Sequence, residues 1–171
     1  MQQKFQKGEY VRYGANGVCL IDDVREMVIE KNPELFYILR PIADRNSTFF
    51  IPVANETLTG KIRCILTREE INDLIDSTRG DTELWIEDRK ARMEYYRVLL
   101  RTCDPRELLR LAAMLYTKKQ ELSSVGKKLS PSDSGVLKQA EELTDNEFAF
   151  VLQLPTDEVG PYIRNRLGLE S

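Results

Sequence analysis

Trp85 is the only tryptophan of the 171-residue chain, and the cations Arg89, Lys90 and Arg92 follow it within seven residues. A large flat side chain of this kind can press against a base step of DNA while neighbouring cations neutralise the flanking phosphates. The same tryptophan can instead pack the first turn of a helix onto its neighbours, and this is the more common use of the residue. The local sequence therefore indicates a nucleic-acid contact or a core residue, and the rest of the chain has to distinguish them.

Residues suited to catalysis are scarce. The chain has no histidine, which removes the commonest general base and the usual zinc ligand. Its cysteines, Cys19, Cys64 and Cys103, are scattered and form no CxxC pair, so we expect reduced thiols and no disulfide framework. The sequence also contains no P-loop motif and no glycine-rich dinucleotide motif. We therefore expect a protein that is not an enzyme and that has no cofactor and no metal site.

Charge is distributed unevenly along the chain. Between Arg89 and Lys128 there are eleven cations and four anions, a net charge of +7 in a chain whose total is -3. Such a run is often only a solvated helix face, but its position beside the tryptophan favours nucleic acid. The acidic C-terminal residues keep the total charge negative, so the overall charge is a poor test of DNA binding.

The first half of the chain has the pattern of a small β domain. Apolar residues alternate or form short β-branched blocks between turn-forming residues. Asn16-Gly17 suits a tight reversal because both residues tolerate positive φ angles, and Pro52 belongs at an edge or a strand end because it has no amide donor. Four or five short antiparallel strands predict a small SH3- or Tudor-like barrel. The expected strands lie within 5–14 and at 18–29, 35–41 and 48–53.

The second half has the pattern of helices. A capping box, Thr67-Arg68-Glu69-Glu70, begins a helix that we expect to end near Thr78, and apolar residues then recur every three or four positions. Asp81 or Thr82 can cap a helix that carries Trp85, and Asp104-Pro105 and Ser130-Pro131 mark two further helix starts. The sequence thus predicts an α+β protein of two domains. Its parts are an antiparallel Tudor/SH3-like β-barrel at 1–66, a short helix and linker at 67–81, and an all-α domain at 82–171.

Three N-terminal segments carry a family resemblance: FQKGEYVRYGANGV at 5–18, FYILRP at 36–41 and TFFIPVAN at 48–55. They resemble the RNA-polymerase-interacting domain of the CarD/CdnL family of bacterial transcription regulators, a domain also found in transcription-repair coupling factors. The capped helix at 67–77, the segment with Trp85 and the Leu129-Ser130-Pro131 helix start resemble the C-terminal half of the same family. The likeness therefore covers essentially the whole chain.

The resemblance implies a Tudor-like barrel that docks on the RNA polymerase β subunit and a helical domain that contacts promoter DNA. In the family, a tryptophan at the position of Trp85 wedges into the minor groove at the upstream edge of the bubble and prevents reannealing. Arg25 stands where the family has a basic residue for the β contact, and Phe50 stands where some relatives have another arginine. Relatives often place basic residues directly after the tryptophan, whereas here Ile86-Glu87-Asp88 intervenes.

Two functions of different classes stay open. The first is a regulator that binds the β subunit and stabilises the open promoter complex; the alternative is an adaptor whose helical domain recruits another protein without touching DNA, which the acidic Glu87-Asp88 pair favours. We expect a cytoplasmic monomer, associated with the nucleoid through polymerase, because no apolar run approaches the ~20 residues that cross a bilayer and no export signal opens the chain. The predicted DNA-binding residues are Trp85, Arg89, Lys90 and Arg92, and the predicted polymerase-binding residues are Arg25, Phe49, Phe50, Ile51 and Pro52.

Overall fold

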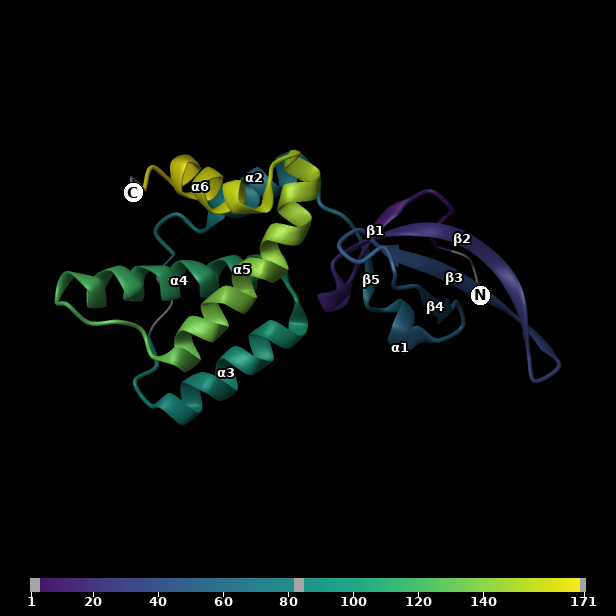
Figure 1. Ribbon diagram of the computed structural model, residues 1–171, viewed down its shortest axis with the longest axis horizontal. Helices are drawn as coiled ribbons and strands as arrows, with labels where there is room; N and C mark the ends of the chain where they lie inside the picture. Colours follow the sequence, from purple (N-terminus) through teal and green to yellow (C-terminus); the bar gives the residue numbers. More distant parts are fainter. Residues whose placement is uncertain (1–3, 82–84, 170–171) are drawn as a thin grey trace. The chain divides into compact units, whose positions relative to one another are not determined.

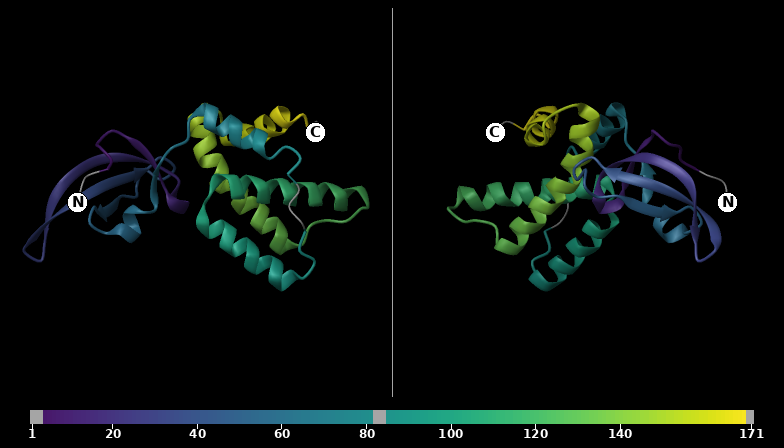
Figure 2. Two further views of the ribbon diagram at one scale, coloured as in Figure 1. Left: turned by 180° about the vertical axis from the view of Figure 1, so that it is seen from behind. Right: turned by 45° about the vertical axis from the view of Figure 1, so that its right-hand side comes forward.

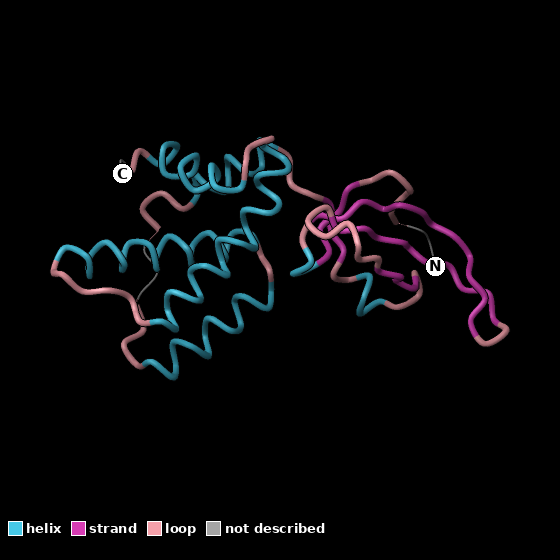
Figure 3. The backbone as a smooth tube through the Cα atoms, in the orientation of Figure 1, coloured by secondary structure: helices cyan, strands magenta, loops and turns pink. Residues whose placement is uncertain are grey.

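The computed structural model of the protein describes residues 4–81 and 85–169 (Figure 1). The chain divides into two compact units, residues 1–66 and 67–171. All strands of the described chain lie in the first unit, and the long helices lie in the second (Figure 3). The predicted α+β architecture in two parts is confirmed.

An antiparallel sheet forms the first unit. Its five strands in the described chain follow the order β4-β3-β2-β1-β5, with bounds β1 (Tyr10–Tyr13), β2 (Val18–Ile29), β3 (Asn32–Pro41), β4 (Phe49–Pro52) and β5 (Ile62–Cys64). The sequence located the first four strands and not β5, because three residues are too few to show an alternating pattern. Since β4 and β5 stand at opposite ends of the order, the described pairings form a curved open sheet, and no ladder closes it into the expected barrel.

The two longest strands, β2 and β3, form a hairpin that extends beyond the rest of the sheet (Figure 2). Its turn residues Glu30 and Lys31 have φ angles of 48° and 73°, the positive values that a tight hairpin turn requires. One face of the sheet holds the core of the unit, where Tyr37 accepts hydrogen bonds on its hydroxyl from the amides of Lys4 (2.9 Å) and Phe5 (3.3 Å). The buried core residues are Phe5, Val11, Tyr13, Cys19, Ile21, Tyr37, Leu39, Ile51 and Ile62.

Helices build the second unit. They are α2 (Arg68–Ser77), α3 (Arg89–Thr102), α4 (Pro105–Ser124), α5 (Pro131–Leu152) and α6 (Thr156–Leu167), while the one-turn α1 (Glu56–Thr59) belongs to the first unit. Three helix starts that the sequence predicted are confirmed: Thr67 forms a capping box with Glu70, and Asp104 and Ser130 cap α4 and α5 ahead of their first-turn prolines. The start expected at Asp81 or Thr82 is wrong, because Asp88 caps α3 and the helix begins after Trp85. None of the helices described is long and apolar enough to span a membrane.

Helix α2 is an integral part of the helical unit. Ile71 and Ile75 on its apolar face are fully buried, and Tyr162 of α6 donates a 2.7 Å hydrogen bond to Asn72. Arg166 of α6 adds a 2.7 Å ion pair with Asp76. The sequence had placed this helix between the domains, at 67–81. The local sequence of α2 could not show this packing, because α6, which covers α2, lies about 90 residues away in the chain.

Candidate functional site

Trp85 lies in the extended segment that leads into α3, and its side chain is half-buried against the core of the helical unit. Two cations lie within cation–π distance of the ring: the guanidinium carbon of Arg92 is 4.2 Å from its centroid, and the ammonium of Lys118 is 4.9 Å away. The ring is therefore only partly buried. It packs on the domain with one part covered and another part open to solvent.

Arg92 is buried, and this corrects the expectation that it faces DNA. Its guanidinium binds Asp133 of α5 through two parallel bonds, Nε to Oδ1 at 2.9 Å and Nη2 to Oδ2 at 3.0 Å. Its Nη1 donates to the carbonyl oxygens of Ile86 (2.8 Å) and Glu87 (3.2 Å). Because its three nitrogens are engaged inside the protein, Arg92 fixes the segment that carries Trp85 and offers no charge to a phosphate.

Asp133 remains ionised in this buried position. Burial alone would raise its pKa, but hydrogen bonds from Arg92 and Ser130, together with the charge of Arg92, outweigh that effect and hold the pKa of Asp133 below its usual value. The ion pair therefore joins the first turn of α3 to the first turn of α5, and a 2.7 Å hydrogen bond from Arg89 to Ser132 adds a second link. The two helix N-termini consequently lie at the same end of the unit (Figure 1).

The predicted cations Arg89 and Lys90 are exposed in the first turn of α3, next to this junction. Two helix N-termini add partial positive charge there, which favours an anionic partner. Glu87 and Asp88 lie between the tryptophan and these cations. Asp88 caps α3 by accepting a 2.7 Å hydrogen bond from the amide of Ala91, so its carboxylate is engaged at the start of the helix. We define the Trp85 face as Trp85, Arg89, Lys90 and Lys118.

Several cations of the +7 segment form ion pairs with neighbouring acids of the described chain. Arg110 pairs with Asp81 at 2.8 Å and with Glu107 at 3.5 Å, and Arg97 pairs with Glu94 at 2.8 Å. These pairs stand on several helix faces. The basic run is consequently no continuous stripe. At the Trp85 face, Arg89 and Lys90 are exposed, whereas Lys118 also pairs with Glu121 at 3.7 Å. The sequence did not predict the contact of Lys118 with the tryptophan, because the two residues are 33 positions apart and no local pattern indicates that they meet.

In the first unit, β4 is an end strand with a free edge in the described sheet. The amide of Val53 donates to the carbonyl of Leu35 at 2.9 Å, which sets the phase of the antiparallel ladder. By the alternation of such a ladder, Phe49 and Ile51 turn their backbone groups toward β3, whereas Phe50 and Pro52 turn theirs outward. Pro52 has no amide donor, and its carbonyl accepts a 3.0 Å hydrogen bond from the amide of Asn55, so the outward edge offers the backbone groups of Phe50 to another extended chain.

The predicted polymerase-binding residues divide between the two faces of the sheet. Ile51 is only 3% exposed and lies in the core, and Phe49 packs on the same core with its ring 5.5 Å from that of Tyr13. Phe50, in contrast, is 47% exposed. Ile51 is thus corrected from a surface contact to a core residue, because alternation along a strand sends neighbouring side chains to opposite faces.

Arg25 shares a face with Phe50 and Pro52. The register pairs Arg25 with Phe36 and Phe36 with Pro52, so these residues form one row across β2, β3 and β4. Directly paired residues project to the same side of a sheet, and strands are about 4.8 Å apart, which places Arg25 roughly 10 Å from Pro52. Arg25 is exposed and its nearest acid, Asp23, lies 3.9 Å away. Together with Phe50 in the adjacent row, this row combines a cation with an exposed aromatic ring beside the β4 edge.

The described residues of the two units show no grouping suited to a metal centre. In particular, no three His, Cys, Asp or Glu side chains within 4–81 and 85–169 are grouped to hold a metal ion. Burial raises the pKa of the Cys19 thiol to about 11, with Arg12 opposing the shift, so this core thiol stays protonated at neutral pH.

Comparison with known proteins identifies the first unit. Residues 5–66 match the family model of the CarD-like/TRCF RID domain, while the comparison with curated proteins gives no match for the chain. The matched range coincides with the first compact unit and contains the free β4 edge and the Arg25 row. The RID family is a protein-interaction domain and not a catalytic one. Residues 5–66 therefore belong to the CarD-like/TRCF RID family and form an RNA polymerase-interacting domain.

Proposed function

We propose that the protein is a transcription regulator that binds the RNA polymerase β subunit through residues 5–66 and stabilises the open promoter complex through the Trp85 face. The match of residues 5–66 to the RID family carries this proposal. The proposed DNA contact of the helical unit rests on a half-buried tryptophan and on exposed cations beside two helix N-termini.

Docking uses the free edge of β4 and the Arg25 row. An extended segment of the β subunit adds to the edge through main-chain hydrogen bonds, and the side chains of Phe50 and Pro52 supply apolar contact beside it. Arg25 stands at the rim, where a charge sets orientation and association rate more than affinity. Phe49 and Ile51 act indirectly, because they hold β4 on the core.

The Trp85 face acts on the melted promoter. The protein lowers no chemical barrier; it shifts the equilibrium to the extent that it binds the open complex more tightly than the closed one. A difference of about 1.4 kcal/mol in the two affinities changes the open-to-closed ratio tenfold. Few phosphates are within reach of Arg89 and Lys90, so free DNA should bind weakly, and attachment to polymerase supplies the local concentration.

An adaptor that recruits a second protein through its helical unit is the competing proposal. Its support is the pairing of Arg97 and Arg110 with neighbouring acids and the burial of Arg92, which leave fewer free cations than the sequence alone indicates. An adaptor and a DNA-contacting regulator both need the RID domain. They differ only in what the Trp85 face binds.

Two measurements test the proposal. Residues 1–66, which contain their own core, should bind the isolated β subunit, and Arg25→Glu should weaken this binding while Lys61→Glu, next to β5 at the other end of the sheet, should not. In the second, the full chain and polymerase are mixed with a forked promoter, and open-complex lifetime is measured for the wild type and Trp85→Ala. Equal lifetimes with intact polymerase binding would reject the DNA contact and leave the adaptor.

A further inference from the structure

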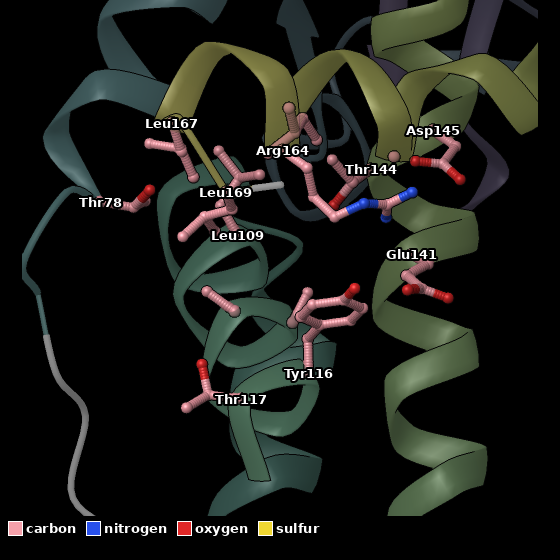
Figure 4. Close-up of a pocket in the computed structure, with 14 residues that line it drawn as sticks. Thr78, Leu109, Tyr116, Thr117, Glu141, Thr144, Asp145, Arg164, Leu167 and Leu169 are labelled. Atoms are coloured by element: carbon pink, nitrogen blue, oxygen red, sulfur yellow. The ribbon is translucent and has the colours of Figure 1, made fainter. Parts of the chain in front are cut away.

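The helical unit contains a pocket that the proposed function does not use. It has a volume of about 130 Å³ and lies among α4, α5 and α6 (Figure 4). Its walls are mainly apolar, with Leu109, Ala112 and Ala113 from α4 and Ile163 and Leu167 from α6. An engineered protein cavity of about 150 Å³ holds a benzene molecule. The pocket therefore accepts a group the size of one ring or a short branched chain, and it is too small for a nucleotide.

Charged side chains stand along one side of this apolar pocket. Glu141 and Asp145 lie one turn apart on α5, and Arg164 reaches toward them from α6, passing above Tyr116 (Figure 4). The guanidinium carbon of Arg164 is 5.5 Å from the centroid of the Tyr116 ring. Within residues 4–81 and 85–169, no hydrogen bond or ion pair engages the side chain of Glu141, Asp145 or Arg164. Their polar groups are therefore available to a ligand.

The two carboxylates differ in how far nearby cations balance them. Burial raises the pKa of Glu141, while the charges of Lys119 and Arg164 oppose the shift. Burial and the neighbouring charges of Glu141 and Glu142 raise the pKa of Asp145 to about 7, and no cation opposes that shift. The Asp145 carboxyl is thus about half ionised at neutral pH, and a cation placed beside it favours the ionised form.

We propose that this pocket binds a small organic cation, a primary ammonium carried on a compact apolar body of about ring size. The body fills the space between α4 and α6, and the ammonium donates to the carboxylates of Glu141 and Asp145, each of which has free acceptor positions. A neutral molecule of the same shape gains only the apolar contact. A carboxylate or phosphate meets two acids and a single guanidinium, which disfavours it.

Charge selectivity in the full-length chain tests this assignment. Isotope-labelled protein is titrated with benzylammonium, benzyl alcohol and benzoate, and binding is followed by NMR amide shifts, which should be largest near Tyr116, Asp145 and Arg164. Benzylammonium should bind at least about tenfold more tightly than the other two probes, because only its charge reaches the carboxylates. Equal binding of the three probes, preference for benzoate, or no binding of any of them would overturn the proposal.

Two variants locate the charge effect. Asp145→Asn keeps the shape of the side chain and should remove most of the preference for benzylammonium over benzyl alcohol. The matched control is Asp157→Asn in the first turn of α6, whose side chain is exposed and does not line the pocket. It should leave the affinity within about twofold of the wild type, since an exposed charge contributes little. An Asp145→Asn protein that is folded and retains the full preference would contradict the assignment.

Discussion

Removing the carboxylate of Asp133 should destabilise the helical unit and release Trp85, although Asp133 is distant from Trp85 in the sequence. The side chains of Arg92 and Asp133 are only 7% and 3% exposed, so solvent screens their interaction little. Asp133→Ala leaves the Arg92 guanidinium buried with two donors unpaired, those of Nε and Nη2. Breaking one side of a buried ion pair costs about 3–5 kcal/mol. Since domains are stable by only about 5–15 kcal/mol, this loss is a large fraction of the total.

The assay is urea unfolding of the full chain followed by the fluorescence of Trp85. As the only tryptophan, Trp85 reports on the helical unit without interference from the RID domain. Asp133→Ala should lower the midpoint strongly and shift the emission of the native protein to longer wavelength, because the segment that holds the ring loses its anchor. The double variant Arg92→Met with Asp133→Leu removes both charges and should recover much of the stability, as replaced buried pairs often do.

Acid should produce the same effect on the wild type. The pKa of Asp133 is lower in the folded than in the unfolded protein, so its contribution is complete above the unfolded value of about 3.9 and is lost as the pH falls toward the folded pKa. Asp133→Ala should lack this part of the acid sensitivity. The reasoning is refuted if Asp133→Ala unfolds within about 1 kcal/mol of the wild type, or if the double variant is as unstable as the single one.

Three further outcomes are expected. Asp145→Asn should stabilise the protein at pH 8 and flatten its stability between pH 4 and 8. The pKa of Asp145 is raised to about 7 in the folded protein, so the wild type loses stability as the pH rises from the unfolded pKa of about 3.9 to about 7, and the amide removes this loss. The shift corresponds to at most ~4 kcal/mol, reduced to about 1–2 kcal/mol by partial exposure, and melting curves against pH measure it. Lys90→Glu should reduce the salt dependence of DNA binding by roughly one unit of slope, whereas Arg101→Glu in the last turn of the same helix should leave it unchanged in the same titration. Phe50→Ala should weaken binding of residues 1–66 to the β subunit in a pull-down without lowering the melting temperature of the domain, since its ring is exposed.

Local sequence rules located most of the elements. Alternation found β1 to β4, and the Asp104-Pro105 and Ser130-Pro131 pairs located the starts of α4 and α5, because a cap and a first-turn proline act on amides within three residues. The limits of such rules appear at β5, which is only three residues long, and at α2, whose covering helix comes near the end of the chain.

The candidate sites were predictable only in part, and Arg92 shows why. In the sequence it resembles Arg89 and Lys90, and on a helix it lies one turn after Arg89, so nothing local separates a surface cation from a buried one. The distinction depends on Asp133, 41 positions later, and on the way α5 packs beside α3. Ile51 was misassigned for a simpler reason. A contiguous run of strand residues was taken as one surface, although its side chains alternate between the core and solvent.

The burial of Arg92 changes what the cations around the tryptophan do. A wedge that is disordered before it meets DNA loses side-chain and loop entropy on binding, and each ordered group subtracts about 0.5–1.5 kcal/mol from the affinity. Here Arg92 holds the backbone at Ile86 and Glu87 and lies against the ring, while Lys118 lies near the ring from α4. The ordering is therefore completed when the helical unit folds. In the proposed function, Arg92 contributes by fixing Trp85 in advance, and contact with phosphate is left to Arg89 and Lys90.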